Sequence, residues 1–365
     1  MEAVNKVNKI KSHTVRSTYD LRSDHLNKSF KIIVGLVFLF FLTNAFIFIS
    51  CRAVEAKSRI RKPSLEKVKT YANAYGVYDA KALSKFMKFD VVIIEPYNVP
   101  NIKFLKNLKQ RGVIIIAYIS VGEAGANRRY FKNWKSYVNT PDNKEIPRSK
   151  VKVTDPVFIG EDPGWPGSYY ADASNPKWHD IILNEEMPYI MWLGNDLYDG
   201  FFLDVLDVAD VYKTMKNGDK MTDGLIDIVK QMRIKYPDKL LIANRGFTVL
   251  KRIAGYIDAF KYEEYSSAYG NIKSEAHYKR YYLKFDKKGK RLNTGEIEIL
   301  KEALKINPRM TIFVLDHVRT KPLDIKTARF CYKEALKLAD ILKCKVLWYA
   351  NSVNQDLPLW PNFKK

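Results

Sequence analysis

Residues 199–208 read DGFFLDVLDV, and this stretch carries the pattern that decides the fold. The turn pair Asp199-Gly200 precedes an apolar run typical of a buried strand, and polar residues, Asp204 and Asp207, close the run. Most of seven further runs share this design of a β-rich segment bounded by polar or turn residues. They are residues 89–97, 112–124, 167–176, 239–246, 257–267, 310–318 and 344–352.

Amphipathic segments separate these runs. Residues 222–235, 295–307 and 326–342 place apolar side chains three and four positions apart, which predicts helices with one buried face. Alternating strands and helices imply parallel pairing through right-handed crossovers. No G-x-G-x-x-G follows the first strand, as a dinucleotide-binding domain would require. The sequence therefore predicts an α/β fold of the (β/α)8 TIM barrel type.

Composition excludes several classes of protein. With 47% hydrophobic and 28% charged residues, the chain can build a sizeable core. Three cysteines without a C-x-x-C pair argue against a disulfide scaffold or a structural zinc site. Cys331 reads as a core residue of a helix, and a disulfide between it and Cys344 stays open. The five histidines include no H-E-x-x-H, and no phosphate-binding P-loop is present.

The N-terminal region contains a long apolar segment. Residues 32–50 read IIVGLVFLFFLTNAFIFIS without a single charge, and about 20 such residues span a bilayer core. We expect a transmembrane or signal-anchor helix here, with the membrane as a partner. The predicted organisation is a basic tail (1–31), this helix (32–50), a linker (51–75) and the barrel (76–365). The side of the helix that follows residue 50 is the more basic, but long domains translocate largely regardless of flanking charge.

Polar residues gather at the C-terminal ends of the predicted strands. In a (β/α)8 barrel these ends surround one mouth, where active sites lie. Helix capping is the alternative for any single Asp or Asn, but not for all of them together. The candidate site combines strand-end groups with aromatic side chains that could face sugar rings. Its members are Glu95, Tyr97, Tyr118, Glu123, Trp165, Asp172, Asp204, Asp207, Asn244, Arg245, Glu263, Glu264 and Asp316.

A mouth rich in carboxylates and poor in histidine suits glycoside hydrolysis. One carboxylic acid protonates the leaving oxygen, while a second carboxylate attacks the sugar or activates water. Oxygen ligands would also suit Mg²⁺ or Ca²⁺, but Asp204-x-x-Asp207 is too short a signal and no calcium-loop spacing is present. We therefore expect no metal and no cofactor.

Several motifs together resemble one family. Residues 118–124 (YISVGEA) with the Arg-Arg-Tyr of residues 128–130 resemble the second-strand signature of glycoside hydrolase family 114, the endo-α-1,4-polygalactosaminidase-like barrels. Residues 165–178, 199–204 and 314–316 resemble later segments of the same family, in the same order. The resemblance covers approximately residues 85–355.

The resemblance implies a TIM barrel that cleaves an exopolysaccharide or aminosugar polymer. It implies Asp204 and Glu263 as the catalytic pair, with the acid/base role on Glu263 and the nucleophile or stabilising role on Asp204. Glu264 is the neighbouring alternative to Glu263, since successive strand residues face opposite sides and only one can face the mouth. Glu95 stands where the family leads us to expect Asp. We also expect a membrane-anchored or exported protein with its catalytic domain outside the cytoplasm.

Two other functions stay open, and the net charge of +22 bears on the second of them. The chain could be a barrel that binds a polysaccharide without cleaving it. It could also be a basic, membrane-tethered protein that binds an anionic polymer. The basic residues are spread along the chain, which suits a solvated lysine-rich surface, and no nucleic-acid recognition motif is visible. We therefore do not expect nucleic acid as a partner.

Overall fold

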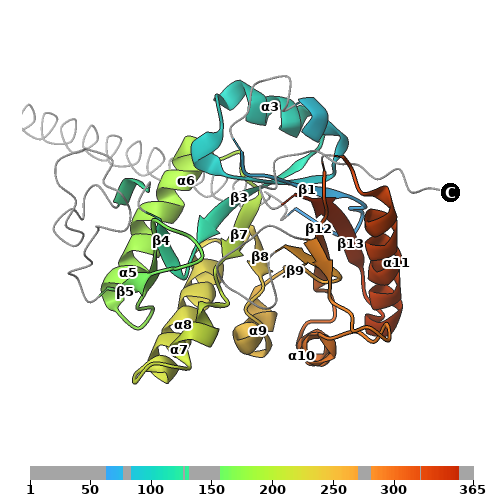
Figure 1. Cartoon of the computed structure of the whole chain (residues 1–365). Coiled ribbons are helices and arrows are strands. Elements are labelled where there is room, and N and C mark those ends of the chain that lie inside the picture. Colours follow the sequence, from blue (N-terminus) through green and yellow to red (C-terminus); the bar gives the residue numbers. More distant parts are fainter. Residues whose placement is uncertain are drawn as a thin grey trace, which may run out of the picture. The chain divides into compact units, whose positions relative to one another are not determined.

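The computed structural model describes residues 63–76, 84–125, 128–130, 157–269, 281–320 and 322–352. Within these residues, eight parallel strands form a barrel, and helices pack around its outside (Figure 1). Seven parallel pairings join neighbouring strands. The strand order is β1 (Tyr71–Ala74), β2 (Val91–Ile94), β3 (Ile114–Ser120), β7 (Gly200–Asp204), β8 (Leu240–Asn244), β9 (Ala259–Glu263), β12 (Thr311–His317) and β13 (Val346–Asn351).

Side chains bring the first and last strands together. The Tyr71 ring on β1 lies 5.5 Å from the Tyr349 ring on β13, and the Tyr71 hydroxyl donates to the Val314 carbonyl at 2.7 Å. Tyr71 also stacks on Phe313 at 4.6 Å. Aromatic rings thus fill the interior, as expected for a TIM barrel, whose centre is a packed core and not a pore.

One predicted barrel strand is wrong. The run at 167–176 contributes β6 (Ser168–Ala171), which pairs antiparallel with β4 (Glu123–Gly125) and β5 (Phe158–Glu161) in a separate small sheet. The two tyrosines of β6 favour a strand, as predicted, but do not indicate which sheet the strand joins. The missing barrel strand is β1, inside the segment expected to be a linker, so the barrel begins before residue 76. The sequence of β1, YANA, is short and has little β-propensity.

Helices occupy the three segments where the sequence predicted them. The three predicted amphipathic segments form α8 (Gly218–Lys235), α10 (Thr294–Ile306) and α11 (Ile325–Leu342). Cys331 is buried on α11, and both it and Cys344 are free thiols. The other helices are α3 (Ile102–Gln110), α5 (Pro176–Asp180), α6 (Met187–Leu193), α7 (Val208–Tyr212) and α9 (Phe247–Ile253). The short turns of helix are η1 (Lys85–Lys88), η2 (Pro96–Asn98), η4 (Ile181–Glu186) and η5 (Ala254–Tyr256), and β10 (Ser267–Tyr269) pairs with β11 (Tyr281–Leu283).

The predicted anchor at 32–50 lies outside the described residues. In the part of the chain that is described, none of the helices combines the length and the apolar character that crossing a bilayer requires.

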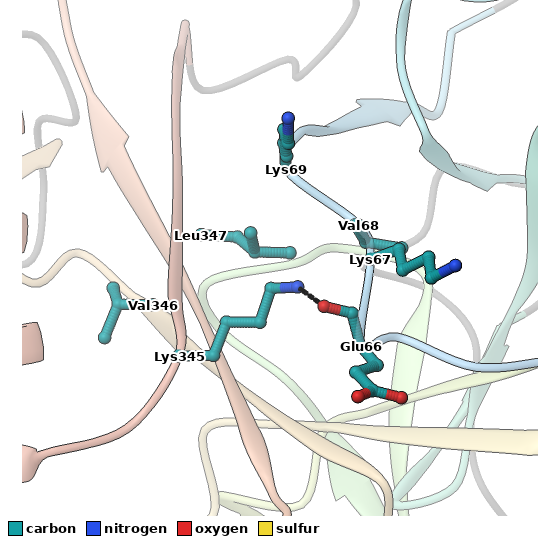
Figure 2. Close-up of a pocket in the computed structure, with 7 residues that line it drawn as sticks. All are labelled: Glu66, Lys67, Val68, Lys69, Lys345, Val346 and Leu347. Carbon is teal, nitrogen blue, oxygen red and sulfur yellow. Dashed lines mark hydrogen bonds between the residues drawn. The ribbon is translucent and has the colours of Figure 1, made fainter.

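A hollow of about 650 Å³ lies at the N-terminal end of the seam between β1 and β13 (Figure 2). It is lined by residues 66–69, which precede β1, and residues 345–347, at the start of β13. The Lys345 ammonium is held there by the carbonyls of Leu65 and Glu66, at 2.8 and 2.6 Å. This end of a TIM barrel generally serves stability, whereas active sites lie at the opposite end, the mouth formed by the C-terminal ends of the strands.

Candidate active site

Three neighbouring strands end in side chains that meet in the mouth. Asp204, Asn244 and Glu263 are the last residues of β7, β8 and β9. The Asn244 amide nitrogen donates to Asp204 Oδ1 at 2.7 Å and to Glu263 Oε2 at 3.1 Å. The two facing carboxylate oxygens are therefore no farther apart than the sum of these distances. The structure brings together the two carboxylates nominated from the sequence, and one buried amide holds both.

The backbone ends all three strands in the same way. Val205, Arg245 and Glu264, which follow directly, have φ angles of 63°, 50° and 61°. This left-handed conformation costs a residue other than glycine about 1–2 kcal/mol, and a β-branched residue such as Val205 rarely adopts it. Gly122 makes room for the first of these turns, because a Cβ at that position would lie 2.1 Å from the Val205 carbonyl oxygen. Backbone strain of this kind is typical of functional sites.

Cationic and hydrogen-bonding groups surround Glu263. His317 Nε2 lies 3.2 Å from Glu263 Oε1, and the Lys261 ammonium lies 3.5 Å from Oε2. Burial acts to raise the pKa of Glu263, but the charge of Lys261 and the hydrogen bond from His317 outweigh it. The pKa of Glu263 consequently lies well below its ordinary value, so this carboxylate is ionised in the resting site.

Acidic groups, in contrast, crowd the Asp204 side of the mouth. The Tyr118 hydroxyl hydrogen-bonds to Asp204. Burial, a hydrogen bond with Asp162 and the negative charges of Asp162, Asp204 and Asp207 raise the pKa of Glu123 to about 9. Burial and the charge of Asp204 likewise raise the pKa of Asp207 to about 6, against the opposing charge of Arg245. Glu123 is therefore protonated at neutral pH.

This raised pKa predicts how stability depends on pH. The folded protein binds the Glu123 proton more tightly than the unfolded chain, so the contribution of that proton is complete below the unfolded pKa, about 4.3, and is lost as pH rises toward 9. Glu123→Gln has no such proton to lose. Between about pH 5 and about pH 9 the wild type should lose more thermal stability than this variant. Melting temperatures across that range test the prediction, and parallel curves for the two proteins would contradict it.

Glu264 belongs to the rim and not to the centre. Arg245 lies 3.1 Å from Asp207 and 3.5 Å from Glu264, and Lys284 lies 3.8 Å from Glu264. The hydrogen bond to Asn244 is made by Glu263. Of the two adjacent glutamates, Glu263 is thus the one placed beside Asp204, while Glu264 joins a half-exposed ion-pair group.

A second ion pair builds one wall of the mouth. Arg128 donates to both oxygens of Glu95, at 2.6 and 2.8 Å, and its guanidinium lies over the rings of Tyr97 and Tyr118 at 4.6 and 5.6 Å. The Tyr97 hydroxyl donates to Glu186 at 2.9 Å. Burial and the charge of Glu186 raise the pKa of that hydroxyl well above its ordinary value. Glu95 and Tyr97 therefore form part of the wall of the mouth, through their contacts with Arg128 and Glu186.

The remaining predicted site residues lie away from the centre. Asp316 is fully buried and accepts hydrogen bonds from the Ser266 and Ser267 amides and from Trp348, at 2.6, 2.8 and 2.8 Å. Both of its oxygens accept hydrogen bonds from the framework, and its role in binding substrate stays a prediction. Asp172 accepts from the Ser174 amide and hydroxyl and shapes the turn after β6. Trp165 lies on the turn before β6 and is 64% exposed.

Sequence reasoning missed several residues of the mouth, among them Lys261, His317 and Arg128. The signal for Lys261 was a lysine inside an apolar strand, two positions before Glu263 and therefore on the same face. His317 follows Asp316, and strand alternation turns it inward where Asp316 turns outward. Arg128 lies in a motif that indicated the family, and its positive charge was not used to predict a role in the site.

The described residues contain no group of three or more His, Cys, Asp or Glu side chains placed to hold a metal ion. Catalysis without a metal stays a prediction.

A (β/α)8 barrel whose mouth holds two carboxylates linked by one amide is an arrangement that glycosidases use. The sequence model of glycoside-hydrolase family GH114 matches residues 53–292, and the chain belongs to this family. The fold resembles the glycoside hydrolase domain of PelA from Pseudomonas aeruginosa, with a TM-score of 0.57 and 18% identity over 79% of this chain and 96% of that one. It also resembles Ega3 from Aspergillus fumigatus in complex with galactosamine, with a TM-score of 0.53 and 12% identity over 81% of this chain and 95% of that one.

Two curated relatives are uncharacterised proteins. One, from Thermotoga maritima, is 27% identical over 154 residues, which are 40% of this chain and 41% of that protein. The other, from Deinococcus radiodurans, is 24% identical over 215 residues, which are 56% of this chain and 63% of that protein. The chain thus spans less than two thirds of the length of either relative.

Proposed function

We propose that this glycosidase cleaves an aminosugar exopolysaccharide, with Asp204 and Glu263 as its catalytic carboxylates and without a metal. The observation that carries the proposal is the Asn244 amide, which holds both carboxylates at the mouth of the barrel. Glu263, which is ionised in the resting site, first takes up a proton from solvent and then donates it to the leaving glycosidic oxygen, while Asp204 attacks the anomeric carbon to form a glycosyl-enzyme. Glu263 then takes a proton from the water that releases the sugar.

The spacing of the pair supports retention of anomeric configuration. Carboxyl groups of retaining enzymes lie about 5–5.5 Å apart, whereas inverting enzymes leave about 6.5–9.5 Å for a water molecule. Two oxygens that contact the same amide nitrogen at 2.7 and 3.1 Å are closer than the inverting range. We expect the first product to keep the α configuration of its substrate, and proton NMR of a reaction in progress checks this. A first product in the β configuration would contradict it.

The charge of the mouth supports a cationic sugar. The protein as a whole carries +22, yet the Asp204 side of the mouth is lined by Asp162 and Asp207 beside the protonated, uncharged Glu123. A polymer of free amino sugars is positively charged and is attracted to such a mouth despite the basic exterior. The similarity to Ega3, whose solved complex contains galactosamine, points to the same class of sugar.

The proposal is tested with the purified protein on two forms of one polymer. An α-1,4-galactosaminan with free amines should be depolymerised, and its fully N-acetylated form should be cleaved more slowly because it lacks the positive charge. Binding of the free-amine polymer without any release of reducing ends would instead favour a polysaccharide-binding barrel. Strongly salt-dependent binding of an anionic polymer, with no cleavage of either galactosaminan, would favour a basic, membrane-tethered protein that binds an anionic polymer.

We further propose that residues 32–50 anchor the protein in a membrane, with the barrel outside the cytoplasm. The length and uncharged character of this segment support the proposal. Protease added to intact cells should remove the barrel, and protection of the barrel until the cells are lysed would oppose this orientation.

A further inference from the structure

Lys261 is a charged side chain in an unusual place. It lies in the middle of β9 with none of its side chain exposed, and its neighbours along the strand are apolar or aromatic. Its ammonium lies 4.8 Å from the centre of the Phe202 ring and 5.8 Å from that of Tyr75, both inside the barrel. Taking an ammonium out of water costs several kcal/mol, and burial accordingly lowers the pKa of Lys261, whereas a nearby anion opposes that lowering and favours the charged form.

That anion is Glu263. The two residues stand two positions apart on one strand, so both point to the interior, with Lys261 one step deeper. The ammonium lies 3.5 Å from Glu263 Oε2, the same oxygen that accepts the Asn244 amide hydrogen bond at 3.1 Å. Cation and amide therefore act together on the Glu263 oxygen that Asn244 links to Asp204.

We propose that Lys261 is a positioning residue that keeps Glu263 ionised in the resting site and directed toward Asn244. The inference rests on the proposed function, because it concerns the carboxylate to which that function gives the proton-donor role. By opposing protonation of Glu263, Lys261 sets the highest pH at which the enzyme can still protonate a leaving oxygen.

Titratable groups from every neighbouring element act on Glu263. They are Asp204 and Asp207 on and after β7, Arg245 after β8, His317 on β12, and Tyr71 and Tyr75 on and after β1. The two aspartates oppose ionisation of Glu263, and burial keeps the two tyrosines neutral by raising their pKa values well above the ordinary one. Arg245 forms ion pairs with Asp207 and Glu264 on the half-exposed rim. Lys261 and His317 thus both lie against Glu263 in the buried part of the site, and Lys261 is the one at the oxygen that accepts the Asn244 hydrogen bond.

Infrared titration of the Glu263 carboxyl group tests the inference without any substrate. The Glu263 signal is assigned by its loss in Glu263→Gln. In the wild type it should titrate below the ordinary glutamate pKa, about 4.3. In Lys261→Met, which keeps the length of the side chain and removes the charge, the midpoint should rise by about 1–3 pH units, the usual effect of an opposite charge at this range. Lys261→Arg should restore a low midpoint.

The activity profile supplies a second readout. In Lys261→Met the alkaline limb of kcat against pH should move to higher pH, and Lys261→Arg should move it back. A purely structural role for Lys261 would lower the melting temperature and leave both midpoints in place, which overturns the inference. If Lys261→Met fails to fold, a wild-type Glu263 that titrates at or above the ordinary value overturns it as well. Absence of hydrolysis by the wild type would defeat the proposed function and leave the infrared result to be judged separately.

Discussion

Asp204→Asn and Glu263→Gln should each lower kcat/KM on a free-amine galactosaminan by on the order of 10³-fold. Each substitution keeps the size of the side chain and removes its ability to carry the charge or proton that the reaction needs. The Asn244 amide can still donate to the remaining carbonyl oxygen at either position, so the fold should survive. Release of reducing ends by the purified variants measures the loss, and circular dichroism verifies the structure.

Two exposed positions provide matched controls for these changes. Asp219→Asn on α8 and Glu298→Gln on α10 make the same chemical substitutions at exposed positions, and Glu298 forms an ion pair with Lys301. Surface pairs of this kind contribute little, so both controls should keep wild-type activity. Full activity in both mouth variants would remove Asp204 and Glu263 from the mechanism.

Arg128→Met should destabilise the protein by about 3 kcal/mol, because it leaves the Glu95 carboxylate largely buried without its cation. Glu95 is only 14% exposed, and both of its oxygens bind the guanidinium. The substitution also removes the cation that lies over Tyr97 and Tyr118. Chemical denaturation measures the loss, and activity should fall with it because this wall of the mouth also carries Tyr118, which hydrogen-bonds to Asp204.

A double variant distinguishes the cost of leaving the Glu95 carboxylate without its cation from the cost of losing the packing of Arg128. Adding Glu95→Gln to Arg128→Met removes the unpaired carboxylate, so the double variant should be more stable than Arg128→Met alone. The matched control is Arg252→Met, which breaks a pair with Asp223 whose side chains are 52% and 62% exposed and should cost less than about 1 kcal/mol. Equal losses for Arg128→Met and Arg252→Met would show that the wall pair contributes no more than a surface pair.

The sequence alone determined the alternation of strands and helices in the barrel and the position of acidic residues at the strand ends that form its mouth. Strands such as 200–204 and 240–244 are apolar runs that end in a polar residue, and this local pattern survives in any context. Once eight parallel strands are assumed, their C-terminal ends must converge, which is why Asp204, Asn244 and Glu263 could be grouped although they are far apart along the chain.

The sequence did not indicate which sheet each strand joins. Residues 168–171 and 71–74 both form strands, but the first joins the small antiparallel sheet and the second completes the barrel. Strand propensity reports whether a segment suits a pleated surface and says nothing about its partner. The short YANA segment becomes a strand because its neighbours bury it on both faces, a condition that exists only in the folded protein.

The charge state of the site was likewise decided by tertiary structure. Glutamates 123 and 263 are the same residue at two strand ends, yet one is protonated at neutral pH and the other is ionised. The difference comes from what lies within a few ångströms: Asp162 beside the first, and Lys261 and His317 beside the second. Electrostatic energy depends on distance and on exclusion of water, and neither quantity exists until the chain has folded.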